Sequence, residues 1–296
     1  MKYKSPVAFK SALLARLKNE SEQQKIPFLR VQMRFLFERL LVRAHAAFPK
    51  VVVKGGAAME FRLSLARTTR DLDLGVYNVP GDLVLSRLQE SGQEDFQDFI
   101  TFEIIDDPHH SILEADGMKY QGRRLRVLAK LAGKPLFGSF GVDIAVGEPA
   151  GPPDQLTIES LLANAGMPPL ELSVYSLESH IAEKLHAYTL PRPHPNSRVK
   201  DLPDLALLAA HRPILETDLR QAIESTFSHR NTHPVPRFVP EPSEAWLRPY
   251  ANIAQENGLP WKDLASLQHA VTSFLDPILE SPGARLWNPL DYKWTL

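Results

Sequence analysis

The sequence predicts an α/β (α+β) fold with a mixed sheet in its first half and a mainly helical second half. Helix-type and strand-type patterns are mixed up to about residue 147, and helical periodicity dominates beyond it. A turn-rich segment, GEPAGPPD, separates the two parts at residues 147–154. We therefore expect two domains, residues 1–150 and residues 151–296.

The first domain is expected to begin with two helices. Two apolar runs have helical spacing, and the second begins near Pro27 and ends near Ala47. The pattern then changes to short apolar and alternating runs with glycine between them. The expected elements are a strand at 51–53, a turn at 55–56, a helix at 57–65, a strand at 71–76, a helix at 81–89 and strands at 99–105, 118–131 and 137–146.

The second domain is expected to be built from helices separated by proline-rich loops at residues 191–195 and 233–242. The expected helices are 177–188, 199–210, 215–227 and 264–279.

Composition sets broad limits on function. The 296 residues are 44% hydrophobic and 23% charged, as in a globular protein, and none is cysteine, which excludes thiolate chemistry. No run approaches the roughly 18 apolar residues of a membrane span, and the first residues lack a secretory apolar run. We expect a cytoplasmic protein without a membrane partner.

The net charge of −1 means that a nucleic-acid partner would need a local basic patch. One candidate lies on the expected strand at 118–131, although a solvated strand face is an equally good interpretation. Its residues are Arg123, Arg124, Arg126 and Lys130.

Asp71 and Asp73 carry the strongest chemical signal. Residues i and i+2 of a strand point to the same side, so the two carboxylates are presented together. Like charges this close favour a cation between them, and Mg²⁺ binds through few carboxylates plus substrate phosphates. Asp143, in the apolar strand FGVDIAV, is a candidate third ligand. The alternative for each acid is a surface or structural carboxylate.

Lys54, Gly55 and Gly56 lie just upstream, after an expected strand and before an expected helix. Glycine lets the backbone approach phosphate oxygens, and a helix N-terminus favours anions. Gly-Gly alone is more often an ordinary turn. A phosphate cradle next to an acidic pair is nevertheless the combination that phosphoryl transfer needs.

The helical half offers a second group. Lys184 borders the apolar stripe of its helix, which suits either a snorkelling lysine or a cation facing a triphosphate. Asp201 and Asp204 lie three residues apart in a first helical turn, where acids are also ordinary partners of the helix dipole.

Together these segments resemble the AbiEii/AbiGii family of nucleotidyltransferase toxins. The resemblance covers nearly the whole chain, and its motifs are KGGAAMEFR, RTTRDLDL, YQGRRLRVLAKLAG, FGVDIAVGE, SHIAEKLHA and SRVKDLPDLALL. It implies a nucleotidyltransferase-fold lobe, a helical lobe that completes the active site, Mg²⁺ or Mn²⁺, a nucleoside triphosphate substrate and a cognate antitoxin. The implied acceptor is RNA, the tRNA 3′ end in particular, with a block of translation as the consequence.

The resemblance also implies residue roles. It makes Asp71 and Asp73 the catalytic acids, Lys184 a nucleotide contact and Asp204 a late catalytic acid, with Asp201 the next choice. Arg70, Lys200 and Asp201 are expected to contact the nucleotide as well. One departure is that Ala57 and Ala58 follow the glycines, so no hydroxyl there holds phosphate.

Three other functions remain open at this point. A small-molecule nucleotidyltransferase of the antibiotic-modifying kind would use the same acids without an RNA path. A phosphotransferase that binds guanosine triphosphate would transfer the γ-phosphate. A binding module with a vestigial site would transfer nothing.

Overall fold

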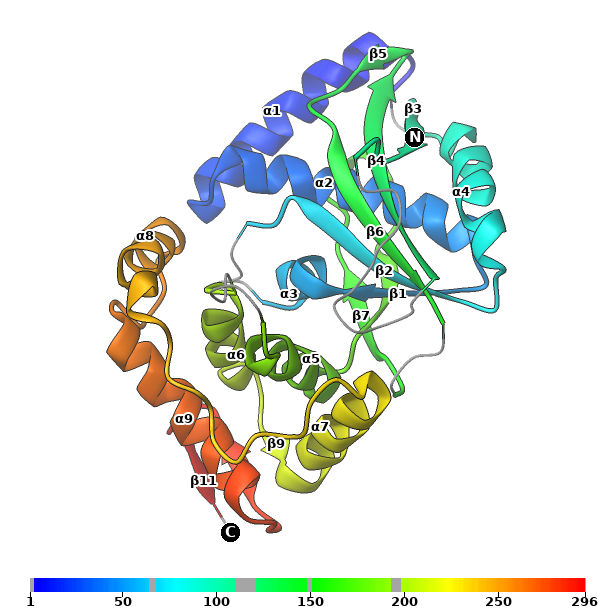
Figure 1. Cartoon of the computed structure of the whole chain (residues 1–296). Helices are drawn as coiled ribbons and strands as arrows, with labels where there is room; N and C mark the ends of the chain where they lie inside the picture. Colours follow the sequence, from blue (N-terminus) through cyan, green and yellow to red (C-terminus); the bar gives the residue numbers. More distant parts are fainter. Residues whose placement is uncertain (1–2, 64–67, 110–120, 148–150, 193–197, 296) are drawn as a thin grey trace. The chain divides into compact units, whose positions relative to one another are not determined.

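The computed structural model describes residues 3–63, 68–109, 121–147, 151–192 and 198–295. The chain forms two compact units (Figure 1). The first comprises Met1–Phe61, Thr68–Pro149 and Pro153–Val174, and the second comprises Arg62–Arg67, Ala150–Pro152 and Tyr175–Leu296.

The first unit is built on a mixed sheet that has eight strands within the described residues, in the order β3-β4-β6-β2-β1-β8-β7, with β5 paired to β4. β2 is parallel to β6 and β1 is parallel to β8, while the other pairs are antiparallel. This mixed sheet confirms the predicted α/β class. The strands are β1 (Lys50–Lys54), β2 (Asp71–Tyr77), β3 (Ile100–Asp106), β4 (Gln121–Leu131), β5 (Lys134–Pro135), β6 (Phe140–Val146), β7 (Asp154–Ile158) and β8 (Leu170–Val174).

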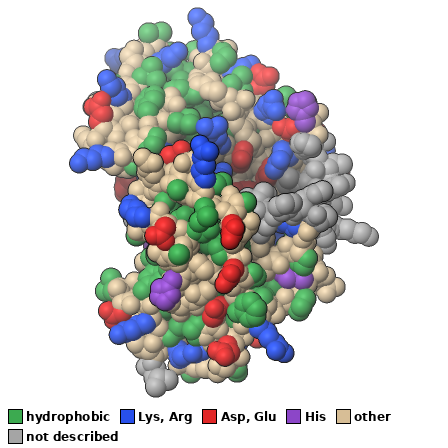
Figure 2. Space-filling view, turned by 60° about the vertical axis from the view of Figure 1, so that its left-hand side comes forward, with side chains coloured by type: hydrophobic (Ala, Val, Ile, Leu, Met, Phe, Trp, Pro, Cys, Tyr) green, Lys and Arg blue, Asp and Glu red, His purple; other side chains and the backbone are tan. Residues whose placement is uncertain are grey.

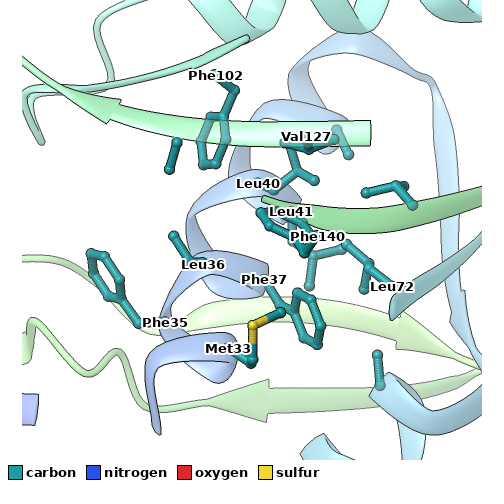
Figure 3. Close-up of a cluster of buried hydrophobic side chains, with 14 of the residues drawn as sticks. Met33, Phe35, Leu36, Phe37, Leu40, Leu41, Leu72, Phe102, Val127 and Phe140 are labelled. Atoms are coloured by element: carbon teal, nitrogen blue, oxygen red, sulfur yellow. The ribbon is translucent and has the colours of Figure 1, made fainter. Parts of the chain in front are cut away.

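Alternation along the strands gives the sheet one apolar face. Leu72 and Leu74 on β2 and Val142 on β6 are buried, whereas the residues between them are acids or small residues on the other face. α2 (Phe28–Ala47) packs its side chains against the apolar face, as Figure 3 shows for Leu40, Phe37 and their neighbours. Each large apolar side chain buried in this way contributes roughly 1.5–3 kcal/mol.

The other helices of the first unit complete its covering. Ser5 caps the N-terminus of α1, where its side chain accepts a hydrogen bond from the backbone N–H of Ala8. Ala57 and Ala58 of α3 join the core. These helices are α1 (Pro6–Gln24), α3 (Gly55–Arg62), α4 (Val84–Gln93) and the short 3₁₀ helices η1 (Gly81–Leu83) and η2 (Ala163–Ala165).

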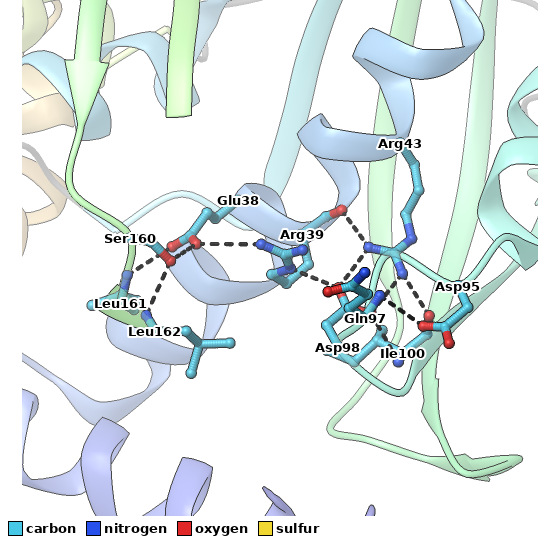
Figure 4. A network of polar contacts seen from close by, with 10 residues as sticks. All are labelled: Glu38, Arg39, Arg43, Asp95, Gln97, Asp98, Ile100, Ser160, Leu161 and Leu162. Carbon is cyan, nitrogen blue, oxygen red and sulfur yellow. Dashed lines mark hydrogen bonds and ion pairs between the residues drawn. The ribbon is translucent and has the colours of Figure 1, made fainter. Parts of the chain in front are cut away.

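Buried charges fix α2 against two other segments (Figure 4). Arg43 donates to both carboxylate oxygens of Asp98, each at 2.8 Å, and Arg39 donates to the same carboxylate at 2.7 Å. Asp98 is fully buried. Glu38 accepts hydrogen bonds from the Ser160 hydroxyl and, at 3.0 Å, from the backbone N–H of Leu161. Such a network specifies the register of α2, because an unpaired buried charge is costly.

The first unit extends past the expected boundary between residues 150 and 151. β7 and β8 were not expected, yet β8 pairs with β1 through Val53 and Val174 and therefore joins the sheet. The alternation of Leu170, Leu172 and Val174 with polar residues is the signal that would have predicted β8. Residues 118–120 of an expected strand and residues 148–150 of the expected boundary lie outside the described residues.

The second unit is mainly helical, as predicted. The helices expected at 177–188, 199–210, 215–227 and 264–279 are present within one or two residues at each end, except that the third of them, α7, ends three residues later, at Arg230. Trp287 is fully buried and donates its indole N–H to the Ala209 carbonyl. The elements are α5 (Leu177–Thr189), α6 (Asp201–Ala209), α7 (Glu216–Arg230), η3 (Glu244–Trp246), α8 (Leu247–Asn257), α9 (Leu264–Glu280) and the strands β9 (Ile214–Leu215), β10 (Leu286–Asn288) and β11 (Lys293–Thr295).

Across the parts of the chain that the structure describes, every helix is too short or too polar to cross a membrane.

Candidate functional site

Three carboxylates lie on the polar face of the first unit's sheet. Asp71 and Asp73 are two residues apart on β2, and β6 runs parallel to β2 with Asp143 directly opposite Asp73. Leu72 and Val142 point to the apolar face, so the three acids share the opposite one. The structure thus places on one face of the sheet the three acids that the sequence singled out as metal ligands.

Glycines next to these acids give the carboxylates their space. A Cβ added at Gly55 would lie 2.0 Å from Asp73 Oδ2, and one added at Gly141 would lie 2.5 Å from Asp71 Oδ1. Gly55 also has φ +54°, which an L side chain rarely adopts. Asp71 therefore lies over β6, and Asp73 lies over the start of α3.

The expected turn at Gly55 and Gly56 was wrong, since both residues already belong to α3. The left-handed conformation of Gly55 redirects the chain between β1 and α3 in a single residue. Ala57 and Ala58 are fully buried, which explains why apolar residues follow the two glycines.

Asp143 is bound on both of its oxygens by one guanidinium. Arg124 Nε lies 2.8 Å from Oδ1 and Nη2 lies 2.6 Å from Oδ2. Arg124 stands directly opposite Asp143 in the antiparallel register of β4 and β6. The pKa of Arg124 is raised, first by this hydrogen bonding and further by the charges of Asp143, Asp71 and Asp107, against the effect of burial.

The other predicted RNA contacts on β4 also have acidic partners. Arg126 and Lys130 share the polar face with Arg124, and Arg123 points to the other side. Figure 2 likewise shows basic and acidic side chains interspersed over the visible face. The pairs are Arg123 with Asp106 at 3.6 Å, Arg126 with Asp107 at 3.1 Å and Lys130 with Glu103 at 2.5 Å. Their role in RNA binding stays a prediction.

In the described residues, no three acidic or histidine side chains converge closely enough to hold a metal ion among them. Asp71 and Asp73 are the residues that could hold Mg²⁺, because this ion takes few protein carboxylates together with substrate phosphates. The glycines at positions 55 and 141 leave room for these two carboxylates on a rigid strand.

The second unit holds another group of predicted residues. Lys184 of α5 lies 2.9 Å from Asp201 Oδ1 and 2.7 Å from Asp204 Oδ2, both in the first turn of α6. The side chains of Asp201 and Asp204 are buried, with exposed fractions of 4% and 0%, and the side chain of Lys184 is 12% exposed. Lys184 therefore turns toward the first turn of α6 rather than snorkelling to solvent. Arg198 approaches Asp201 at 3.7 Å.

Three predicted nucleotide contacts occupy other positions. Lys54 ends β1, opposite Asp73 in the antiparallel register, and so lies on the polar face. Arg70 is exposed immediately before β2. Lys200 is exposed at the N-cap of α6.

Sequence reasoning missed two contributors to the polar face. Gly141 went unremarked although it lies two residues before Asp143, on the same side of β6, and gives Asp71 its space. The role of Arg124 as the partner of Asp143 also went unpredicted, because it depends on the register between β4 and β6.

Comparison with known proteins finds one matching family model and several similar solved structures. The family model of the nucleotidyl transferase AbiEii toxin, a type IV toxin–antitoxin system, matches residues 39–275. MenT4, a nucleotidyltransferase toxin from Mycobacterium tuberculosis H37Rv, has a similar fold, with a TM-score of 0.59 and 18% identity over 95% of this chain and 92% of that one. JHP933 from Helicobacter pylori matches with a TM-score of 0.43 and 17% identity over 85% of this chain and 95% of that one. No curated protein matches the sequence.

Proposed function

This chain belongs to the AbiEii family of nucleotidyltransferase toxins, and from that premise we propose that it transfers a nucleoside monophosphate from a nucleoside triphosphate to the 3′ end of tRNA. Loss of the free acceptor end would block translation. A cognate antitoxin is the partner that such a toxin implies. The observation that carries the proposal is the pair of carboxylates, Asp71 and Asp73, on one face of β2 beside Gly55.

Asp71 and Asp73 are the residues that would hold Mg²⁺ or Mn²⁺. When bound, the ion would neutralise phosphate charge and favour loss of pyrophosphate. Gly55 keeps Asp73 in place by offering it space, and the adjoining start of α3 provides backbone N–H groups suited to phosphate oxygens. Lys54 and Arg70 supply positive charge at the ends of β1 and β2.

Within the second unit, Lys184 is the proposed nucleotide contact. Asp201 and Asp204 orient its ammonium group, since both carboxylates bind it in the first turn of α6. Asp204 is the proposed late catalytic acid, and Lys200, exposed at the N-cap of α6, is a further candidate for phosphate binding.

The test is transfer of label from each of the four nucleoside triphosphates, labelled at the α-phosphate, to total tRNA in Mg²⁺ or Mn²⁺. We expect labelled tRNA with wild type, and a loss of at least about 100-fold with Asp71→Asn or Asp73→Asn. Asp82→Asn, at an exposed acid of η1, is the matched control and is expected to transfer normally.

Oxidising the 3′ diol of the tRNA with periodate is expected to abolish labelling, because the proposed acceptor hydroxyls are destroyed. Labelling that survives this treatment would place the acceptor elsewhere. No labelling of any RNA with any nucleotide, by a folded protein, would refute the proposed function.

A small-molecule acceptor is the second candidate, and the acid-paired side chains of β4 are the observation that favours it. In that case label would enter an acid-soluble product and leave the tRNA unlabelled. Transfer from the γ-phosphate but not the α-phosphate would instead indicate a phosphotransferase.

A further inference from the structure

The pairing of Arg124 with Asp143 holds a guanidinium in a fixed position without burying it. Two parallel N–H···O contacts, at 2.8 Å and 2.6 Å, restrain both the tilt and the rotation of its plane. The Arg124 side chain nevertheless keeps 42% of its surface exposed, against 18% for Asp143. The contact uses Nε and Nη2, so other N–H donors of the guanidinium are left for a further acceptor.

Stability is a weak explanation for this pair. Ion pairs with this much exposure contribute little to folding. The backbone ladder between β4 and β6 already fixes the two residues opposite each other. The consequence of the pair is therefore mainly local: it neutralises one of three neighbouring carboxylates and directs a cation toward the polar face.

The position of Arg124 relates it to the proposed metal ligands. Asp71, Asp73 and Asp143 share the polar face, and Asp71 leans over Gly141 toward β6. Arg124 on β4 is directly opposite Asp143 on β6, and Asp143 is directly opposite Asp73 on β2, so these three residues lie in one row across the sheet. A triphosphate held at Asp71 and Asp73 would bring several negative oxygens beside this guanidinium.

We propose that Arg124 binds a phosphate group of the nucleoside triphosphate and that Asp143 is its positioning residue rather than a third metal ligand. This inference rests on the proposed function. A planar guanidinium suits phosphate because it offers two parallel donors, and one that is already immobilised loses less conformational freedom on binding. Without Arg124, three carboxylates on one face would repel the incoming anion.

The experiment separates phosphate contacts from metal ligands by two titrations on the full chain. Affinity for a fluorescent nucleoside triphosphate is measured at saturating Mg²⁺, and the Mg²⁺ concentration for half-maximal binding is measured at fixed nucleotide. The variants are Arg124→Gln, Asp143→Asn, their combination, and Asp71→Asn as the metal-ligand reference.

We expect Arg124→Gln to weaken nucleotide binding about 10-fold at saturating Mg²⁺, with the Mg²⁺ requirement unchanged within about twofold. Asp143→Asn should weaken nucleotide binding by a smaller factor and also leave the Mg²⁺ requirement unchanged. The double variant should bind the nucleotide no more weakly than Arg124→Gln does, because the two residues act as one unit. Asp71→Asn should raise the Mg²⁺ requirement.

Arg212→Gln is the matched control. The Arg212 side chain is 42% exposed, as that of Arg124 is, and binds Glu178 at 3.0 Å, so its loss removes a similar ion pair. Nucleotide affinity should stay within about twofold of wild type. Arg124→Lys keeps the charge but loses the two parallel donors of the guanidinium, so its nucleotide affinity should lie between those of wild type and Arg124→Gln.

Two outcomes would overturn the proposal: an Mg²⁺ requirement that rises in Asp143→Asn as it does in Asp71→Asn, or unchanged nucleotide affinity in Arg124→Gln. Wild-type protein that binds no nucleotide in Mg²⁺ would instead refute the proposed function itself. Melting curves of each variant show whether a loss of binding comes from a loss of fold.

Discussion

The carboxylate of Asp73 occupies the space in which a side chain on Gly55 would lie. A Cβ built at position 55 would be 2.0 Å from Asp73 Oδ2, and the backbone there has φ +54°. The glycine therefore has two reasons to be present, one conformational and one steric. The steric reason links the first residue of α3 directly to a proposed metal ligand.

Replacement of Gly55 by alanine tests that link. The left-handed backbone should cost about 1–2 kcal/mol of unfolding free energy, and Asp73 should rotate away from the new methyl group. Urea unfolding measures the first effect. Label transfer to tRNA, expected to fall at least about 100-fold, measures the second.

Gly133→Ala is the control for Gly55→Ala. Gly133 also has a positive φ, +76°, but no atom lies within 4 Å of its added Cβ. The Gly133→Ala variant should lose a similar free energy of unfolding and keep full transfer activity. Equal activity in the two variants would mean that Asp73 does not need the space above Gly55.

Loss of the Asp98 charge should destabilise the first unit strongly. Asp98→Asn leaves Arg39 and Arg43 buried beside a neutral side chain, and breaking a buried charge network in this way costs about 3–5 kcal/mol. Urea unfolding of wild type and variant at pH 7 measures the difference. A loss below about 1 kcal/mol would contradict the role of this network in fixing α2.

The stability that Asp98 contributes is expected to depend on pH in the acid range. Burial raises the pKa of Asp98, but the hydrogen bonds from Arg43 and the charges of Arg39 and Arg43 outweigh it and hold the pKa below its ordinary value of 3.8. A lowered carboxyl pKa stabilises the fold above that value and ceases to do so as pH falls through the folded pKa. The stability gap between wild type and Asp98→Asn should therefore narrow below about pH 4.

The buried contacts of Lys184 make its removal costly. Lys184→Met leaves the carboxylates of Asp201 and Asp204 buried without the ammonium group, for an expected loss of about 3–5 kcal/mol in urea unfolding. Arg212→Met is the comparison, because Arg212 pairs with Glu178 while 42% exposed and should cost at most about 1 kcal/mol. Similar losses of unfolding free energy in Lys184→Met and Arg212→Met would contradict a stabilising role for the contacts of Lys184.

The second unit should weaken in mild acid through His186. Burial, followed by the charges of His233 and Arg230, lowers the pKa of His186 to about 4 from its ordinary 6.5. The unfolded chain then binds more protons between these values, so stability falls as pH decreases from about 6.5 to 4. The limiting slope for one group is about 1.4 kcal/mol per pH unit.

Unfolding free energies measured across that pH range check the prediction. His186→Gln should flatten this part of the curve, although it also loses the packing of the imidazole against Phe227. His269→Gln, at an exposed position of α9, should leave the slope of wild type intact. An unchanged slope in His186→Gln would assign the proton uptake to another group.

The sequence by itself determined those features that depend on neighbouring residues. Asp71 and Asp73 share a face because side chains alternate along any strand, and the helices α5, α6, α7 and α9 follow from a 3.6-residue apolar period. Their local geometry is the same in every fold, so the patterns suffice to predict them.

Only the tertiary structure decided which distant residues meet. The register of β6 against β2 puts Asp143 opposite Asp73, and its register against β4 puts Asp143 opposite Arg124, which binds it. The pairing of β8 with β1 extends the first unit to Val174. Strand register is set by the packing of whole faces and by chain connections, which no short stretch of sequence contains. For that reason the acids were predictable as a set, whereas the partner of each acid was not.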